Sequence, residues 1–478
     1  MDDSTLSPQS KALRINLDST FYGTFAEIGA GQEVARWFFH VGGAAGTVAK
    51  TISAYDMSIS DAIYGKSDRY VSRQRLEAML AYEFDLMVER LASARAESTA
   101  FFAFANTVAT RSYKRRDDGQ GWLGVRFQSH PKSPASEVIV HVYTLDKERA
   151  REQEALGILG VNLLFGALYL AQQPDALIAS LLDTLTRDRV EIDMIKLSGP
   201  AFGGVDNRLM SLQLVQHGFT DAAMFTASGE VVQPSEVLYK KPILVERGRF
   251  RPVTRTTLEV LDRATVQFLE HPDVQGEEPV ILMEMTLQDL ASGDRIDHRD
   301  YLARVDLLHA LGKAVLISNH GPYHELAESL TRHTQKPIGI ALGATNFAEL
   351  ARERQFQDLP GGLLEATGRL FKHNVRVYVY PALDRTTHQL IDPHTVEIPL
   401  PGKHLWTYLR ESDFVEPIRN YTAEYLAIDP DDVLARIQSG DTTWEQMVPP
   451  AIVDTIKQDQ LFGWHPPTGD RTSGSRSS

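Results

Sequence analysis

Residues 314–342, AVLISNHGPYHELAESLTRHTQKPIGIAL, contain a short apolar segment, a polar turn, an amphipathic segment and a second apolar segment. The apolar segments AVLIS (314–318) and PIGIAL (337–342) have the length and composition of buried strands. Residues 325–333, between them, have the apolar spacing of a helix. Two strands joined by such a helix usually pair in parallel through a right-handed crossover. The stretch therefore predicts an α/β fold with a parallel sheet.

The same alternation of strands and helices extends in both directions from this stretch. Further apolar segments predict strands at 138–143, 190–197, 222–226, 279–285 and 375–380, with helices between them. This order is typical of a parallel-sheet, Rossmann-like core. Stretches 194–214 and 315–330 both run from a strand through Ser and Gly-Pro into a helix. Either two related halves that arose by duplication or the shared residue preferences of such turns would explain this similarity.

The N-terminal region, 1–130, is predicted to be mainly helical. Residues 70–91 repeat apolar side chains at three- and four-residue steps, and turn-rich segments follow at 117–124 and 130–135. Beyond it we expect a first α/β half at 131–256 and a second at 257–400. A C-terminal extension at 401–468 and a disordered Gly/Ser/Arg tail at 469–478 complete the predicted organisation.

Composition excludes several classes of protein. The 478 residues include 49 basic and 63 acidic side chains, so the net charge of -14 argues against binding to nucleic acid or to an anionic membrane. The absence of cysteine excludes disulfides and thiolate metal sites. Residues 1–12 do not resemble a secretory signal, and the uncharged stretch 155–171 is shorter than the ~20 residues that span a bilayer. We expect a soluble, cytoplasmic protein that forms a homo-oligomer, as many chains of this size do.

Polar loops follow the predicted strands at the ends where open parallel sheets bind ligands. Small residues and free backbone N–H groups at these ends favour an anion, although helix capping explains each loop taken singly. Several such loops converging on one crevice would bind a small anionic or phosphorylated ligand, with a nucleotide as one candidate. The residues predicted to bind it are Ser198, Gly199, Asp206, Asn207, Arg208, Asn319, Gly321, Gly343, Thr345 and Asn346.

The loop 319–325, NHGPYHE, carries the strongest signal for chemistry. His320 and His324 are suited to acid/base catalysis near neutral pH, and we predict them to be the catalytic pair. With Glu328 they could also hold a metal ion. HELAE has Glu328 where the zinc-protease motif HExxH has its second histidine, so that motif is broken. Surface or capping histidines are the structural alternative, and we assign neither a metal nor a cofactor.

Three further features have a structural and a functional interpretation. Glu191 and Asp193 lie on one face of a strand, which indicates either a sheet edge or a polar site. Stretch 240–255 contains six cations and one acid, and would either collect an anionic substrate or phosphate groups, or form a salt-bridge surface towards acidic groups of another subunit or domain. Residues 29–35 match GxGxxxA, a variant of a dinucleotide-binding loop that close helix packing also explains.

Four stretches resemble an uncharacterised bacterial family: GTFAEIGAGQEVAR (23–36), VGGAAGTVAKTISAYDM (41–57), VDNRLMSLQLV (205–215) and PSEVLYKKPILVERG (234–248). Its members are labelled either nicotinate/nicotinamide mononucleotide adenylyltransferase or TonB-dependent receptor. An outer-membrane receptor would need an export signal and many alternating strands of ~10 residues. The sequence shows neither pattern, so the second label is not expected to apply. The first label implies a nucleotide-binding α/β enzyme with an HxGH-type motif. The nearest match here, His320-Gly321-Pro322-Tyr323-His324, has a different spacing.

The sequence therefore favours an α/β enzyme that acts on a small anionic or phosphorylated ligand, with histidine acid/base or metal chemistry. Transfer of a nucleotidyl or other phosphate-containing group is the reaction class that fits such a ligand. The alternative is a non-catalytic protein that binds a ligand or assembles with copies of itself.

Overall fold

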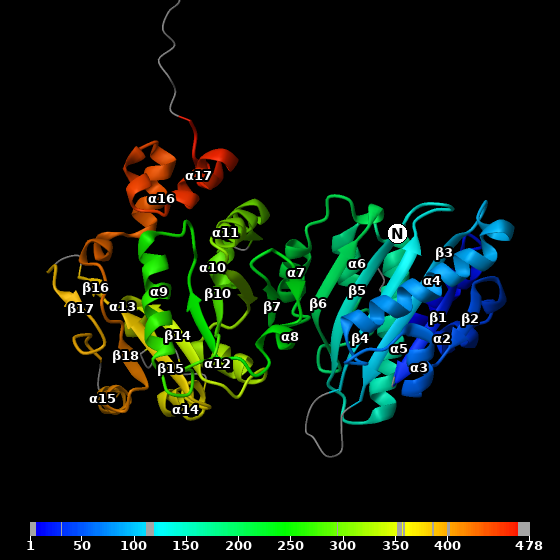
Figure 1. Cartoon of the computed structure of the whole chain (residues 1–478), viewed down its shortest axis with the longest axis horizontal. Helices are drawn as coiled ribbons and strands as arrows, with labels where there is room; N and C mark the ends of the chain where they lie inside the picture. Colours follow the sequence, from blue (N-terminus) through cyan, green and yellow to red (C-terminus); the bar gives the residue numbers. More distant parts are fainter. Residues whose placement is uncertain are drawn as a thin grey trace, which may run out of the picture. The chain divides into compact units, whose positions relative to one another are not determined.

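The computed structural model describes residues 6–466, apart from 30, 111–118, 294, 351–355, 357–358, 385–386 and 399–401. The chain forms two compact units, 1–223 and 224–478 (Figure 1). Residue 130 lies in the turn between two paired strands of the first unit, and residue 256 lies inside a helix of the second. The two units meet at residue 223, which is none of the predicted boundaries at 130, 256, 400 and 468. The predicted tail at 469–478 is outside the described residues.

The first unit is built on a six-stranded sheet, sheet A, with the strand order β2-β1-β3-β4-β5-β6. Strand β1 pairs in parallel with both β2 and β3, whereas β3, β4, β5 and β6 pair antiparallel with one another. The N-terminal region thus contains strands as well as the predicted helices. The strands are β1 (Phe21–Gly29), β2 (Val48–Ile52), β3 (Ala100–Ala109), β4 (Gly119–Gln128), β5 (Ala135–Thr144) and β6 (Val190–Ser198).

The expectation of parallel strands is wrong for β5 and β6. Two helices, α5 (Arg149–Tyr169) and α6 (Pro174–Ser180), pack against each other in the connection between these strands. A single crossover helix returns the chain to the end of the sheet at which the first strand began, and the next strand then runs parallel to it. A second helical segment brings the chain back to the end at which the first strand finished. The next strand then runs antiparallel. β6 is also the last strand of sheet A, so Glu191 and Asp193 lie on an edge strand.

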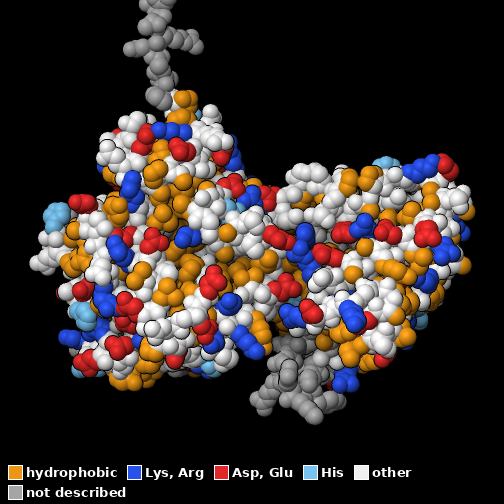
Figure 2. Space-filling view, in the orientation of Figure 1, with side chains coloured by type: hydrophobic (Ala, Val, Ile, Leu, Met, Phe, Trp, Pro, Cys, Tyr) orange, Lys and Arg blue, Asp and Glu red, His pale blue; other side chains and the backbone are white. Residues whose placement is uncertain are grey.

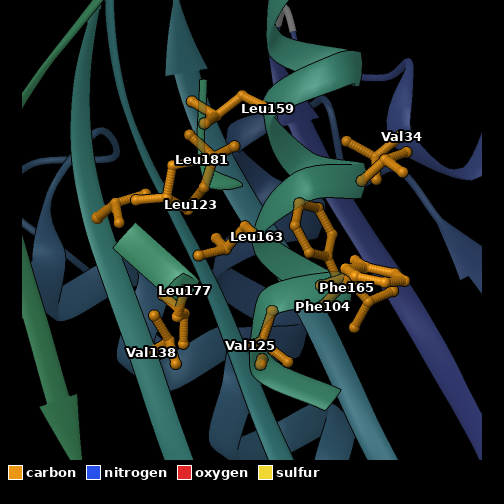
Figure 3. Packing of buried hydrophobic residues seen from close by; sticks show 14 of the residues in the cluster. Val34, Phe104, Leu123, Val125, Val138, Leu159, Leu163, Phe165, Leu177 and Leu181 are labelled. Carbon is orange, nitrogen blue, oxygen red and sulfur yellow. The ribbon is translucent and has the colours of Figure 1, made fainter. Parts of the chain in front are cut away.

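Helices cover both faces of sheet A. Phe102 and Phe104 of β3 belong to the large core cluster under α5, α1 (Pro8–Leu17) and α2 (Val34–Val41). Phe101 and Ala103 point to the opposite face, against α4 (Arg73–Arg95), because side chains alternate along a strand. Figure 3 shows leucines of α5 packed over the branched side chains of β4 and β5. The other helices of the unit are α3 (Met57–Tyr64) and α7 (Asn207–Gln216).

The uncharged stretch 155–171 lies in α5 and its C-terminal turn, and is almost entirely buried. Its glycines let α2 approach: a Cβ at Gly160 would meet Val34 Cγ2 at 2.3 Å, and one at Gly157 would meet Trp37 Nε1 at 2.9 Å. The stretch is therefore a core helix. Among the described residues, no helix is long and apolar enough to span a membrane.

The second unit contains sheet B, with the strand order β18-β15-β14-β9-β10-β13-β7-β8. The strands from β18 to β13 pair in parallel, and β7 and β8 pair antiparallel. The protein is thus an α/β protein with parallel strands in both sheets, and sheet B is the Rossmann-like core. The strands are β7 (Ala222–Phe225), β8 (Val231–Val232), β9 (Ile243–Arg247), β10 (Val280–Thr286), β13 (Ala314–Ser318), β14 (Ile338–Gly343), β15 (Val375–Tyr380) and β18 (Val415–Pro417).

Helices alternate with these strands, as the sequence predicted, and two small hairpins project from the unit. The hairpins pair β11 (Ala291–Ser292) with β12 (Arg295–Ile296), and β16 (Ala382–Leu383) with β17 (Leu390–Ile391). The helices are α8 (Pro234–Leu238), α9 (Arg255–Leu269), α10 (Leu287–Leu290), α11 (His298–Ala310), α12 (Tyr323–Thr331), α13 (Ala344–Leu350), α14 (Gly362–Leu370), α15 (Lys403–Glu411), α16 (Pro430–Ser439) and α17 (Pro450–Asp459).

Candidate functional site

Sheet B changes winding direction between β9 and β14. From β9 the chain proceeds to β10 and β13 on one side, and then returns past β9 to β14, β15 and β18 on the other. In such sheets the connections on the two sides lie on opposite faces, which leaves a crevice at the carboxyl ends of the two strands where the order reverses. The residues that follow β9 and β14, together with the neighbouring loop after β13, therefore form the candidate site.

Arg247 joins the ends of three strands at this point. Its Nε and Nη2 donate to the two carboxylate oxygens of Glu284 on β10, at 2.8 and 2.9 Å. Its Nη1 donates to the backbone oxygen of Gly321 at 2.6 Å. Ser318 at the end of β13 also donates to Glu284, at 2.6 Å. The charge of the fully buried Glu284 is thus balanced by the bidentate guanidinium, and the Ser318 hydroxyl adds a further hydrogen bond. The bond from Arg247 to Gly321 fixes the position of the loop after β13.

Tyr323 connects this group to the loop after β14. The Arg247 guanidinium lies 4.5 Å from the centre of the Tyr323 ring, within range of a cation–π interaction. The side chain of Asn346 hydrogen-bonds Tyr323, and burial raises the pKa of the Tyr323 hydroxyl. The structure therefore brings together three of the predicted positions, Gly321, Asn346 and the adjoining His320. The sequence did not single out Arg247, Glu284 or Tyr323 as members of this site.

The remaining predicted residues of the loops after β13 and β14 occupy the same edge of sheet B. His320 is 8% exposed, and its backbone N–H donates to Ser318 Oγ at 3.3 Å. Asn319, Gly321 and Thr345 are exposed, and Gly343 is half-buried. Apart from their neighbours in the chain, no atom lies within 4 Å of a Cβ built at Gly321 or Gly343, so both glycines border open space.

The predicted ligand-binding residues in the first unit have local structural roles. Asn207 bonds the backbone of Leu197 on β6 through both its amide oxygen and its amide nitrogen, at 2.7 and 2.9 Å. Asp206 caps α7 by accepting from the N–H of Arg208, and also pairs with the Arg208 guanidinium. Gly199 has a φ of 91°, and a Cβ there would lie 2.7 Å from Ser136 Cα. Gly199 and the adjacent Ser198 therefore shape the turn after an edge strand of sheet A.

His324 is buried in the core of the second unit, so its pairing with His320 in catalysis has no support in the structure and stays a prediction. Its side chain is 4% exposed and lines a small cavity in the core with Phe356 and Trp406. Burial lowers its pKa, and the charge of Arg369 acts in the same direction. Glu328, the third residue of the alternative metal set, binds Arg369. Among the described residues, no group of three or more His, Asp or Glu side chains could hold a metal ion.

The basic stretch 240–255 forms salt bridges within the second unit. Besides Arg247, Arg249 pairs with Asp431 and Arg251 with Asp300, at 2.5 and 2.6 Å. In the view of Figure 2, blue and red side chains are interspersed over the surface. These three arginines thus pair with acids of their own unit, whereas a salt-bridge surface towards another domain or subunit stays a prediction.

Glu246 is a buried carboxyl group that the sequence analysis did not single out. It lies on β9 beside Met283 and Ala341 and is 6% exposed, and its Oε2 has no hydrogen-bond partner among the described residues. Burial raises the pKa of Glu246 well above the ordinary value. The nearby charge of Lys313 lowers this pKa and that of Asp262 raises it, so the two charges act against each other. A carboxyl group directly after three apolar residues of a short strand is the sequence signal that could have found it.

We expect Glu246→Gln to stabilise the second unit increasingly as the pH rises. The folded chain keeps the Glu246 proton at pH values where the unfolded chain has lost it, so the contribution of Glu246 to wild-type stability falls as the pH rises above the unfolded pKa of ~4.3. Urea unfolding should show little difference at pH 4 and a gain of at least about 1 kcal/mol at pH 8. The exposed Glu424→Gln is the matched control. An equal effect of Glu246→Gln at both pH values would contradict this expectation.

Two polar groups in the first unit also escaped the sequence analysis. His141 Nδ1 lies 2.6 Å from Asp193 Oδ1, so the carboxylate on the edge strand has a buried histidine partner. Glu27, near the end of β1, accepts hydrogen bonds from the N–H groups of Val34 and Ala35 at 2.8 and 3.1 Å. Burial raises the pKa of Glu27 to about 7. The first N–H groups of α2 after the GxG loop are therefore bonded to the protein's own carboxyl group.

The fold and the crevice define the class: an α/β protein with a Rossmann-like parallel sheet. The sequence matches no protein-family model, and no curated protein matches it. Among solved structures, competence/damage inducible protein CihA from Agrobacterium tumefaciens is similar to 35% of this chain over 98% of its own length, at 18% identity and a TM-score of 0.25. A CinA superfamily protein from Enterobacter cloacae is similar to 35% of this chain over 96% of its own, at 16% identity and a TM-score of 0.24.

A third similar structure is Plasmodium falciparum nicotinic acid mononucleotide adenylyltransferase complexed with APC. The likeness covers 47% of this chain and 98% of that one, at 12% identity and a TM-score of 0.30. All three likenesses are partial.

Proposed function

We propose that the second unit binds a small anionic ligand, of the phosphorylated or nucleotide class, at the carboxyl ends of β9, β13 and β14. The observation that supports this most is the coincidence of the β9/β14 reversal point with the Arg247–Glu284 pair and the loop 319–322. Crevices of this type are the usual ligand sites of doubly wound sheets.

The backbone supplies the donors for such an anion. Helix α12 has Pro322 at its N-cap and no side chain capping it. The first N–H groups of a helix lack intrahelical partners, and the helix dipole favours negative charge at this end. Arg247 is positioned at the same loop, but Glu284 already offsets its charge, so its contribution is to orient the loop.

His320 is the proposed acid/base group. It is next to Gly321, at the entrance to α12, and an imidazole gains or loses a proton near neutral pH. A reaction that transfers a phosphate-containing group to or from the ligand would use such a residue, and this is the class of transferase that we propose. His324 is not part of this proposal, because it lies in the core.

We expect Gly321→Glu to abolish anion binding and Gly321→Gln to preserve most of it. Gly321 has open space around its Cα and a φ outside the left-handed region, so either side chain fits without strain. The carboxylate alone adds a negative charge at the anion position, which should cost at least about tenfold in affinity. Thermal stabilisation of the full chain by ATP, ADP and inorganic phosphate measures the difference.

The same assay can contradict the proposal. If none of these anions stabilises the wild type, or if Gly321→Glu binds as well as Gly321→Gln, the crevice is not an anion site and the non-catalytic alternative is favoured. Once a ligand is identified, His320→Ala should bind it and lose about 10²–10⁴-fold in turnover. The exposed His373, before β15 at the opposite edge of sheet B, gives the control variant His373→Asn.

A further inference from the structure

A small cavity lies between α12, α14 and α15 in the second unit. Its volume is about 10 Å³, and three of its lining side chains, His324, Thr367 and Trp406, carry polar atoms. The other lining residues are apolar. A volume of roughly 10–15 Å³ on this measure is what one water molecule needs. The cavity is therefore too small for any organic ligand.

The polar atoms around this cavity complement one another. His324 Nδ1 and Trp406 Nε1 are both buried and have no hydrogen-bond partner within the described part of the chain. The indole nitrogen can only donate. Thr367 Oγ1 donates to the backbone oxygen of Leu363 at 2.6 Å, and its lone pairs can accept a further bond. With a neutral imidazole, the three side chains around the cavity thus carry one donor and two acceptors, and leaving the two buried ring nitrogens unpaired in the core would cost stability.

We propose that this cavity binds one water molecule, which accepts a hydrogen bond from Trp406 Nε1 and donates to His324 Nδ1 and Thr367 Oγ1. Three hydrogen bonds are typical of a buried water. The arrangement requires a neutral His324 with its proton on Nε2. The opposite tautomer would leave one hydrogen of the water without an acceptor, because the rest of the cavity is apolar.

The charges around His324 are compatible with a neutral ring. Arg369, on the neighbouring helix, lowers its pKa, whereas Glu328 and Glu365 act in the opposite direction, and burial has the largest effect. The water joins three helices, one of which, α12, starts directly after the loop 319–322. His324 is therefore a positioning residue that fixes the start of α12. The catalytic role predicted from the sequence would instead require contact between His324 and a ligand.

Two measurements on the wild-type chain test the water directly. A high-resolution crystal structure should show one ordered solvent peak within hydrogen-bond distance of Trp406 Nε1, His324 Nδ1 and Thr367 Oγ1. NMR of the chain with ¹⁵N-labelled histidine at pH 7 should show His324 protonated on Nε2 alone. An empty cavity, or a proton on Nδ1, would overturn the proposal.

Coupling between two substitutions gives a test in solution. Trp406→Phe should increase the equilibrium constant for unfolding in both backgrounds. The increase should be about fivefold larger in the wild type than in a His324→Phe background, because both residues share one water. Trp444, another buried tryptophan of the second unit, provides the control: Trp444→Phe and His324→Phe should combine additively. Additive behaviour of the Trp406 and His324 substitutions would contradict a shared water.

Discussion

Replacing Arg247 with methionine is expected to destabilise the second unit by about 3–5 kcal/mol, the usual consequence of removing one partner of a buried ion pair. Glu284 is fully buried, and Arg247 donates to both of its oxygens. Without the guanidinium, Ser318 alone would remain to stabilise the carboxylate among the contacts described above. Equilibrium urea unfolding followed by circular dichroism measures the loss.

Two controls separate the lost ion pair from other effects of the substitution. The double variant Arg247→Met/Glu284→Met should recover much of the stability, because it leaves no buried charge behind. Arg249→Met removes a guanidinium whose partner, Asp431, is 66% exposed, and should change stability by no more than about 1 kcal/mol. If Arg247→Met unfolds within about 1 kcal/mol of the wild type, the pair does not hold the strand ends together.

The second large effect is expected at Lys11, in the first unit. Its side chain is 1% exposed, and Nζ donates to Asn162 Oδ1 at 2.8 Å, to Asp183 Oδ2 at 2.6 Å and to the backbone oxygen of Ser180 at 3.3 Å. Burial lowers the pKa of Lys11, and the pairing with Asp183 opposes this. Lys11→Met should therefore cost about 2–4 kcal/mol, since it leaves these three acceptors without the ammonium group.

The size of this loss depends on Asp183, which is 22% exposed and can be partly solvated after the substitution. Arg36→Met is the control, because Arg36 is 73% exposed and pairs only with a neighbour on its own helix turn, Glu33, among the contacts described. It should change the unfolding free energy by about 0.5 kcal/mol or less. Equal destabilisation by Lys11→Met and Arg36→Met would show that the buried lysine adds nothing.

The Lys11 cluster also explains why the apolar stretch 155–171 contains a polar side chain. Asn162 is the polar side chain in the centre of the apolar stretch 155–171. Its amide nitrogen donates to the backbone oxygens of Leu181 and Asp183, both at 2.9 Å, while its oxygen accepts from Lys11. A polar group in a core helix thus predicts a buried partner, but the sequence does not indicate that the partner lies 151 positions away.

For the candidate site, the sequence predicted the loops and missed the residues that hold them. The loops 319–322 and 343–346 were predicted because small and polar residues interrupt apolar strands. Arg247 had only a general role in a basic stretch, and Glu284 had the appearance of an ordinary strand residue. Their role in holding the site comes from an ion pair between neighbouring strands. The two residues are 37 positions apart in the chain, so no local sequence pattern indicates that they meet. The same limit applies to His324, whose burial depends on helices that follow it in the chain.

The amino-acid sequence by itself determined the alternating strands and helices, the burial of the apolar stretch 155–171 and the polar character of the strand ends. These features follow from side-chain periodicity and turn preferences, which act over a few residues. Only the tertiary structure decided that β4, β5 and β6 run antiparallel, that the chain divides after residue 223, and which polar groups meet. Strand direction and buried pairing depend on the path of the chain between distant segments, and that path is selected by the packing of the whole core.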